Sequence, residues 1–329
     1  MRNFIIRRVI LGLFITFFGA MLSYTVIRSL PTSYVESIAR QRASNPLSTK
    51  SYQEWLAELN QVYGLDKGII PGFFGWMGNA IKGDFGDSWH YGIPVTDKFA
   101  DVIWVSMILN VITTLVQFFI AIPLGILAAR KQYSRTDYAI TFFALMGISL
   151  PTFFLATILK YVFAIKLQWF DLYGLTGRFH TTMTPFQQTM DIAYHLVLPV
   201  ITLMMLSIGS LMRYTRTNML EVLNSDYIRT ARAKGLPEKV VINKHAFRNT
   251  LIPLVTSLSG ILPGMFTGAM ITETLYQIPG IGYISYQAII RGDIPFAMFY
   301  MVFLILLTQV SILLSDILYA IVDPRIRVN

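Results

Sequence analysis

Long apolar stretches separated by shorter polar segments dominate the pattern along this chain. A helix needs about 20 mostly apolar residues to cross the hydrocarbon core of a bilayer, and six stretches reach that length. They are residues 9–30, 102–129, 138–164, 193–212, 250–272 and 297–321. The pattern therefore predicts an all-α polytopic membrane protein with six transmembrane helices, in which residues 1–329 form a single transmembrane domain.

The first apolar stretch is expected to remain in the membrane as a span. Arg2, Arg7 and Arg8 precede it, as basic residues precede a secretory signal. The apolar run is longer than a signal peptide needs, however, and no cleavage site of small residues closes it.

Composition supports the bilayer as the solvent, because 54% of the residues are hydrophobic and only 14% are charged. Cysteine is absent, which excludes disulfides, thiolate metal sites and a cysteine nucleophile. The net charge of +9 would favour a nucleic acid only if it lay on one soluble face. It lies instead between the apolar runs, so no nucleic-acid partner is expected.

The distribution of charge predicts the orientation. If the N-terminus is cytoplasmic, the inner segments hold 16 of the 27 Lys and Arg residues but only 6 of the 18 Asp and Glu residues. Basic residues favour the cytoplasmic side. We therefore expect a multi-pass protein of the cell membrane (plasma or inner) with both termini in the cytoplasm.

Two segments outside the membrane are long. The extracytoplasmic segment 31–101 contains Trp55, Tyr63, Trp76 and Trp89 among Gly and Pro, which predicts a small ordered cap on the outer surface. The alternative is a long connector with interfacial aromatic side chains. The second is the cytoplasmic segment 213–249.

Helix signals divide this cytoplasmic segment. Ser225 is expected to cap a helix with its side chain, and Asp226 and Lys234 suit the two ends of the helix dipole. Gly235 predicts the end of this helix, and Pro237 predicts the start of a second one. Two short helices should meet at Gly235.

The first of these helices has the surface of a docking element. Tyr227, Ala231 and Lys234 are expected on one side of the helix. The small side chains of Thr230, Ala231 and Ala233 allow a partner to approach closely, and Arg229 and Arg232 can bind carboxylates or carbonyls. The alternative is a basic loop that merely obeys the rule of cytoplasmic positive charge.

The segment DYIRTARAKGL, residues 226–236, resembles the cytoplasmic signature of ABC importer permeases, specifically the dipeptide/oligopeptide (and nickel) branch. Three further motifs agree with the B-type subunit of that branch: GDFGDS at 83–88, ETLYQIPGIG at 273–282 and DPRIR at 323–327. Arg229, Thr230 and Ala231 stand where the broad importer signature has Glu-Ala-Ala.

The resemblance implies the fold of a type I ABC importer permease and a mechanism in which a coupling helix sits in a cleft of an ATPase subunit. The implied coupling residues are Asp226, Tyr227, Ile228, Arg229, Thr230, Ala231, Arg232, Ala233, Lys234, Gly235 and Leu236. The implied partners are a second homologous permease, two ATPase subunits, an extracytoplasmic solute-binding protein, membrane lipid and a peptide substrate.

No catalytic chemistry is expected in this chain. The phosphate-binding pattern G-x-x-x-x-G-K-[ST] is absent, so ATP and Mg would be bound by the partner ATPase subunits and the chain would not be an enzyme. The spacing of His90, His180, His195 and His245 matches no metal motif, so no metal site is expected.

Two groups of residues are candidates for the transport pathway or its gate. Gly260, Gly264 and Gly268 recur every four residues along the fifth apolar stretch, where small side chains permit tight helix packing or can line the pathway. Just beyond it, the motif with Glu273, Pro279 and Gly280 borders the outer gate or the binding-protein dock, or simply reconnects two spans.

Two alternatives stay open. A nickel or glutathione ABC importer permease would share the same scaffold. An ion-coupled secondary transporter is a weaker alternative, because such carriers place a carboxylate near the membrane midplane. Here Arg28, Lys160 and Asp316 lie near the predicted ends of spans, where side chains reach the interface.

Overall fold

The computed structural model describes residues 2–30, 34–46, 48–250 and 261–322, with side chains described from residue 6 and excluding 261–263 and 315–322. The described residues form helices and one isolated β-bridge between Asp87 and Pro94. This part of the chain therefore confirms the all-α prediction.

The helices, in which η1 and η3 are π-helices and η2 is a 3-10 helix, have these bounds: α1 (Arg2–Arg28), α2 (Tyr34–Ala43), α3 (Tyr52–Val62), α4 (Ile69–Ala80), α5 (Val95–Arg130), α6 (Arg135–Ser149), α7 (Thr152–Leu159), η1 (Lys160–Lys166), η2 (His180–Thr182), α8 (Pro185–Leu223), α9 (Asp226–Ala233), α10 (Glu238–Val240), η3 (Val241–Ala246), α12 (Ile261–Phe266), α13 (Met270–Tyr276), α14 (Ile281–Arg291) and α15 (Ile294–Val322).

Within the described ranges, four helical segments are long and apolar enough to cross a membrane: Ile6–Arg28, Val95–Arg130, Pro185–Leu223 and Ile294–Leu314. A fifth span would be the pair Arg135–Ser149 and Thr152–Lys166, which is bent by 105°. The bend falls at Leu150, whose extended backbone is what a residue before proline prefers. The prediction of one continuous helix over 138–164 is therefore wrong at this point.

The remaining predicted span, 250–272, lies partly outside the described residues, because 251–260 are not described. Its described part is also discontinuous, since α12 ends at Phe266 and α13 begins at Met270. Between them Gly268 has a φ of 73°, a left-handed conformation that interrupts a helix. The expected single helix is thus two short ones here.

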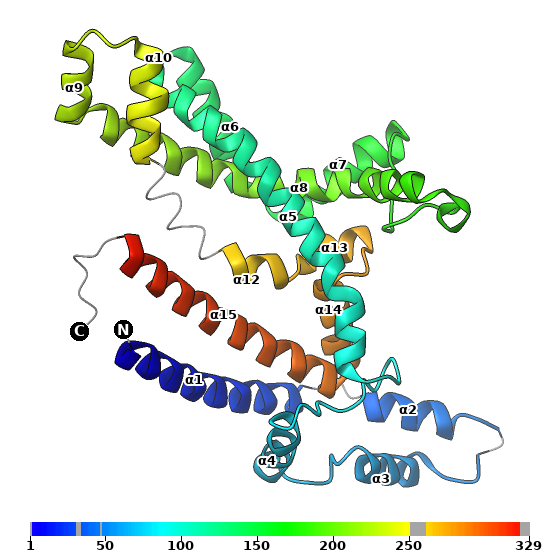
Figure 1. The fold of residues 1–329 in the computed structure, drawn as a ribbon. Coiled ribbons are helices and arrows are strands. Elements are labelled where there is room, and N and C mark those ends of the chain that lie inside the picture. The colour runs from blue at the N-terminus through cyan, green and yellow to red at the C-terminus, as the bar shows by residue number, and fades with distance from the viewer. Residues whose placement is uncertain (1, 31–33, 47, 251–260, 323–329) are drawn as a thin grey trace.

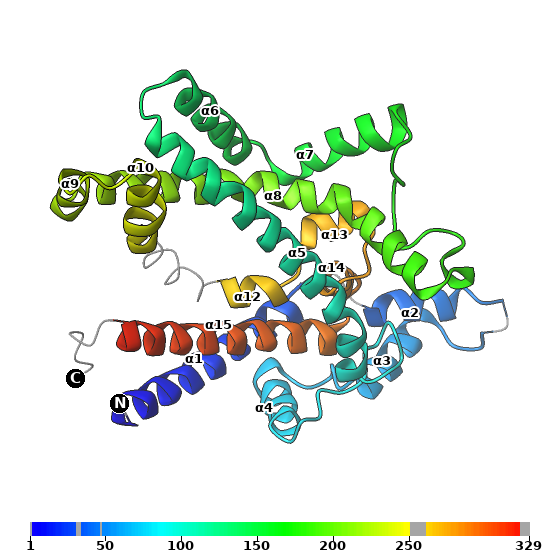
Figure 2. The same cartoon turned by 45° about the horizontal axis from the view of Figure 1, so that its top comes forward.

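The helices form two groups joined at one end (Figures 1 and 2). In the first group α1 runs beside α15, and Ala20, Ala297 and Met298 are buried between them. In the second, α5 and α6 pack against α8. Glycines allow close backbone approach there, because a Cβ added to Gly125 would lie 2.7 Å from the carbonyl oxygen of Met212.

Helix α14 links the two groups. Ile281 and Ile284 of α14 pack in one core cluster with Phe99 of α5 and Phe296 of α15. A polar contact supports the joint, because Asp293 before α15 accepts a hydrogen bond from the hydroxyl of Ser88, the last residue of the GDFGDS motif.

The segment 34–80 forms α2, α3 and α4, and α2 and α3 share their own apolar cluster around Val35, Ala39 and Leu59. In Figure 1 these two helices lie at the opposite end of the molecule from α9 and α10. The start of α1 and the end of α15 lie toward the same side as α9 and α10.

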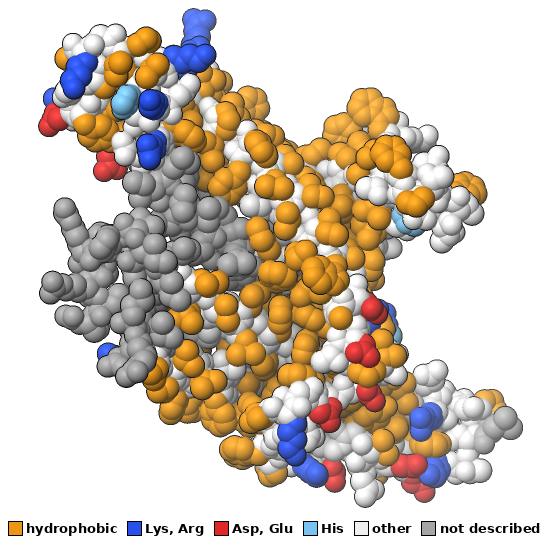
Figure 3. Space-filling view, in the orientation of Figure 1, with side chains coloured by type: hydrophobic (Ala, Val, Ile, Leu, Met, Phe, Trp, Pro, Cys, Tyr) orange, Lys and Arg blue, Asp and Glu red, His pale blue; other side chains and the backbone are white. Residues whose placement is uncertain are grey.

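Helices α5 and α8 have 36 and 39 residues, so at 1.5 Å per residue they are about 54 and 59 Å long. The hydrocarbon core is only about 30 Å thick. Both helices must therefore project beyond it. Figure 3 shows Lys and Arg side chains gathered over α9 and α10 at the projecting end, and hydrophobic side chains over the middle of the molecule.

Candidate functional site

Helix α9 follows α8 after a short turn and covers the segment in which docking is expected. It spans Asp226–Ala233, with Ser225 in the N-cap position. The expected capping bond is not made, because the hydroxyl of Ser225 donates to the carbonyl oxygen of Val222 at 2.6 Å. The predicted start of the helix is confirmed, and the predicted capping contact is wrong.

One face of α9 is buried against the bundle. Ile228 is 0% exposed and Ala231 is 7% exposed, in a cluster with Ala129 of α5, Met219 of α8 and Val241 of η3. This placement corrects the expectation that Ala231 lies on the docking side with Tyr227 and Lys234. This burial follows the hydrophobic periodicity of a surface helix, because Ile228 and Ala231 are three positions apart and lie on the same face.

The opposite face of α9 is open. Tyr227 is 48% exposed, and the side chain of Arg229 is 72% exposed. Thr230, Ala233 and Lys234 are also exposed. A partner approaching the projecting end of α5 and α8 would meet this face.

The two arginines of α9 are held by nearby carboxylates. Arg229 lies 3.4 Å from the carboxylate of Asp226, and Arg232 donates two hydrogen bonds to Glu238, at 3.2 and 2.8 Å. These bonds from Arg232 lower the pKa of the Glu238 carboxyl below its ordinary value. The second pair therefore ties α9 to α10 across the intervening turn.

Gly235 forms that turn. Its φ is 75° and its amide donates to the carbonyl oxygen of Arg232 at 2.9 Å, which is how glycine commonly ends a helix. Leu236 follows it and is exposed, and α10 starts at Glu238 after Pro237. The predicted arrangement of two short helices meeting at Gly235 is confirmed.

The second candidate region, around Glu273, is built on a buried carboxylate. Glu273 of α13 is 0% exposed. Its Oε1 accepts hydrogen bonds from the hydroxyl of Ser106 in α5 at 2.7 Å and from the amide of Ala269 at 2.9 Å. Its Oε2 accepts from the amide of Tyr283 in α14 at 3.0 Å. One side chain thus joins three helices.

The turn between α13 and α14 fits closely around this carboxylate. A Cβ added to Gly280 would collide with both Ser106 and Glu273. A Cβ added to Gly268 would lie 2.8 Å from the Cα of Gly282. Pro279 precedes Gly280 in the same turn. The glycines of the ETLYQIPGIG motif therefore serve close packing around Glu273.

The other glycine candidates are placed differently. Gly260 lies outside the described residues. Gly264 is in α12, and a Cβ added there would have no described atom within 4 Å. Gly264 and Gly268 do not share one helical face, because the helix is interrupted at Gly268, between α12 and α13.

Sequence patterns missed a second contact in this region. Lys160 begins the π-helix η1, and its ammonium group donates to the carbonyl oxygen of Leu275 at 2.6 Å. The same group lies 3.9 Å from the centre of the Tyr173 ring and 5.4 Å from that of Tyr276. This half-buried cation clamps the end of α13 to η1, and a break from α-helical to π-helical geometry often marks a functional position.

Comparisons with known proteins agree with the architecture. Residues 121–328 match the family described as "Binding-protein-dependent transport system inner membrane component". The oligopeptide transport system permease protein AppB of Bacillus subtilis (strain 168) is 35% identical over 328 residues, which cover 99% of this chain and 100% of that protein. The oligopeptide transport system permease protein OppB of Salmonella typhimurium is 33% identical over the same shares of both chains.

Among solved structures, a chain of the MetNI methionine ABC transporter in an inward-facing conformation aligns with a TM-score of 0.48 and 14% identity, over 66% of this chain and 95% of that one. That score is too low for a comparison of individual helices.

Proposed function

Because this chain belongs to the binding-protein-dependent transport system inner membrane components, we propose that it is one of two membrane-spanning subunits of an ATP-driven importer for peptides. The chain forms half of the translocation pathway and pairs with a second, homologous permease. ATP and Mg are bound by two ATPase subunits, and an extracytoplasmic solute-binding protein delivers the substrate.

The observation that supports coupling most strongly is the exposed face of α9 at the projecting end of α5 and α8. Residues 226–236 form a short helix and a turn whose inner face is fixed to both long helices through Ile228. A force applied to the outer face would reach α5 and α8 without first deforming a flexible loop. The cleft of an ATPase subunit is the partner that we assign to this face.

Tyr227 and Arg229 are the residues that we expect to dominate docking. Tyrosine and arginine are enriched among residues that carry interface binding energy, and both side chains are exposed, with Arg229 held only by its surface pair with Asp226. Ala233 leaves room beside them. Coupling requires that the ATPase subunits contact this face differently in their open and closed states.

The junction around Glu273 is proposed as part of the outer gate. Glu273, Pro279 and Gly280 hold α13, α14 and α5 in one arrangement, and Gly264 and Gly268 lie on the segment that leads to it from the inner side. Alternating access would move this rigid unit as a whole. We also propose that both termini of the chain lie in the cytoplasm.

The substrate class is proposed from relatives named as oligopeptide and dipeptide permeases. Import of nickel or glutathione is the alternative within the same family. Uptake by proteoliposomes that contain the whole transporter separates them, with radiolabelled peptide, glutathione and nickel offered in turn through the cognate binding protein. We expect ATP-dependent uptake of the peptide and no uptake of glutathione or nickel.

The docking role is tested in the same proteoliposomes. The double variant Tyr227→Ala, Arg229→Glu should lower ATP-dependent uptake at least about tenfold, because it weakens docking of the ATPase subunits. Arg135→Glu, which changes another exposed cation at the start of α6, is the matched control and should transport normally. Normal uptake by the double variant, or uptake driven by an ion gradient without ATP, contradicts the proposal.

A further inference from the structure

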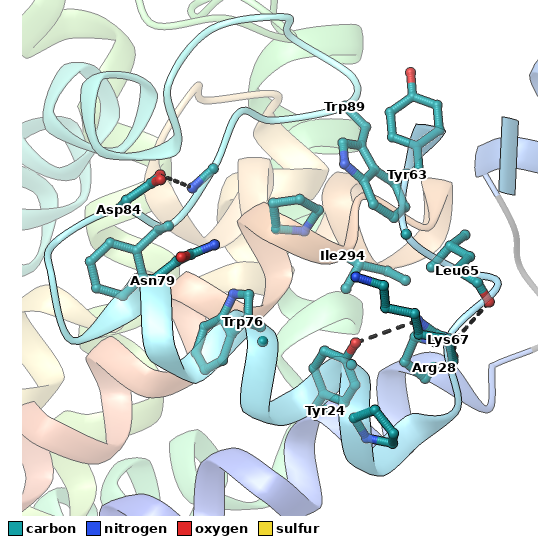
Figure 4. A pocket seen from close by; sticks show the side chains of 17 residues that line it. Tyr24, Arg28, Tyr63, Leu65, Lys67, Trp76, Asn79, Asp84, Trp89 and Ile294 are labelled. Atoms are coloured by element: carbon teal, nitrogen blue, oxygen red, sulfur yellow. Dashed lines mark hydrogen bonds between the residues drawn. The ribbon is translucent and has the colours of Figure 1, made fainter. Parts of the chain in front are cut away.

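A pocket of about 330 Å³ lies where the end of α1, the turn between α3 and α4, the loop after α4 and the start of α15 meet (Figure 4). Arg28 and Lys67 stand at one end of it and Asp84 at the other, with Trp76 between them. The pocket therefore offers positive and negative charge at opposite ends. None of the docking or gate residues proposed above lines it.

The two cations have different tasks. Arg28 donates hydrogen bonds to the carbonyl oxygens of Leu65 and Lys67, each at 3.0 Å, so it fixes the turn that forms the wall. The ammonium group of Lys67 has no hydrogen bond or ion pair within the described part of the chain. It is available to an anion.

The opposite end is suited to a cation. One carboxylate oxygen of Asp84 accepts from the amide of Gly86 at 2.9 Å, and the carboxylate forms no ion pair with any described residue. Aromatic rings line the space between the two ends, including those of Tyr63, Trp76 and Trp89. Such rings stabilise an ammonium group that lies over their faces.

A second hollow of about 550 Å³ adjoins the pocket and shares Trp76 and Phe85 with it. Its other walls are almost wholly apolar and come from α1, α4 and α15. Because α1 and α15 contain spans, this groove lies against the hydrocarbon region.

Helix α4 has the character of an interfacial helix. Ile70 is 68% exposed and Phe74 is 55% exposed on it, and Ile81 directly after it is 79% exposed. Beside the spans of α1 and α15, such exposed apolar side chains favour a position at the boundary between headgroups and acyl chains. The charged pocket is then at headgroup depth, and the groove continues from it toward the acyl chains.

The geometry points to a binding site for one zwitterionic phospholipid with a primary ammonium headgroup. Its phosphate binds at Lys67, where the fixed guanidinium of Arg28 adds positive charge, its ammonium group binds at Asp84 among the rings, and an acyl chain occupies the groove. The buried indole N–H of Trp76, which has no hydrogen-bond partner among the described residues, supplies a donor where headgroup and chain meet. The site does not depend on the transport function proposed above.

Native mass spectrometry of the full chain tests the site, after exchange into an equimolar mixture of phosphatidylethanolamine and phosphatidylglycerol. We expect one phosphatidylethanolamine to be retained. The double variant Lys67→Gln, Asp84→Asn should lower its occupancy about tenfold. Lys82→Gln, which removes a cation outside both hollows, is the matched control and should retain the lipid. Equal occupancy in the double variant and the control overturns the proposal.

Substitution of two glycines of α4 by a larger residue would fill the pocket and the groove. Gly75 lines the pocket and Gly78 lines the groove, and a Cβ added to either has no atom within 4 Å. Gly75→Leu and Gly78→Leu should each displace the lipid, with an unchanged melting temperature in detergent as the check on folding. Retention of the lipid by both variants, or retention of phosphatidylglycerol as tightly as phosphatidylethanolamine, contradicts the assignment.

Discussion

The hydroxyl of Ser106 in α5 donates a hydrogen bond of 2.7 Å to the carboxylate of Glu273 in α13, and the two residues are 167 positions apart. The same hydroxyl accepts from the amide of Ile281 at 2.8 Å. A single serine thus connects the first turn of α14 with the carboxylate that organises the ETLYQIPGIG motif. Buried polar groups persist in a bundle when their partners satisfy them in this way.

Replacing the Glu273 carboxylate should weaken the contact between α5, α13 and α14. In Glu273→Gln an amide NH2 group faces donors, so at least one buried N–H loses its partner, and we expect a loss of about 2 kcal/mol of stability. Ser106→Ala should cost about 1 kcal/mol. Thermal unfolding of the purified chain in detergent measures both. If the losses in the double variant simply add, the two side chains do not interact as described.

The turn at Gly280 should tolerate no side chain. In Gly280→Ala the new methyl group collides with Ser106 and Glu273, and we expect at least about 2 kcal/mol of destabilisation from overpacking. Gly264→Ala is the control, because its methyl group meets no described atom. Its melting temperature should be unchanged or slightly higher. Equal effects of the two substitutions would contradict the close fit around Glu273.

The link between Arg232 and Glu238 should depend on pH. The pKa of Glu238 is lowered in the folded chain, chiefly by the hydrogen bonds from Arg232. The stabilisation is therefore present above the ordinary pKa of about 4.3 and is lost as the pH falls through the lowered value. Both side chains are exposed, so its size should stay below about 1 kcal/mol.

Comparison of wild type with Glu238→Gln checks this link. The variant should melt slightly lower at pH 7, and the difference should vanish in acid, where Glu238 is protonated in both states. A difference that persists unchanged below pH of about 3 would show that the carboxylate charge is not responsible.

Local signals along the sequence predicted much of this architecture. Apolar stretches located the four long spans, because the hydrophobic requirement of a bilayer is the same at every span. Gly235 predicted the end of α9 and Pro237 predicted the start of α10, since both residues act through their own backbone geometry. The relation of residues 226–236 to the projecting ends of α5 and α8 needed the structure.

Long-range contacts explain what the sequence did not predict. The pairing of Ser106 with Glu273, and that of Ser88 with Asp293, joins residues separated by 167 and 205 positions, and no periodicity encodes such pairs. Pro151 and Gly268 are residues that commonly interrupt helices, so the sequence contained a signal for both the bend and the break. Apolar content continued across both points, so hydropathy alone predicted helices that were too long. The burial of Ala231 was missed because its small side chain fits a docking face and a packed face equally well.

The absence of cysteine from the chain makes site-directed crosslinking the most direct test of the central claim that α9 docks an ATPase subunit. Tyr227→Cys and Thr230→Cys would be introduced singly into the assembled transporter and treated with a short thiol-to-amine crosslinker, with Lys82→Cys on the opposite side as control. We predict crosslinks from positions 227 and 230 to an ATPase subunit, with a yield that changes when ATP is trapped, and none from position 82. An equal yield from position 82, or no crosslink from either α9 position, would contradict the account.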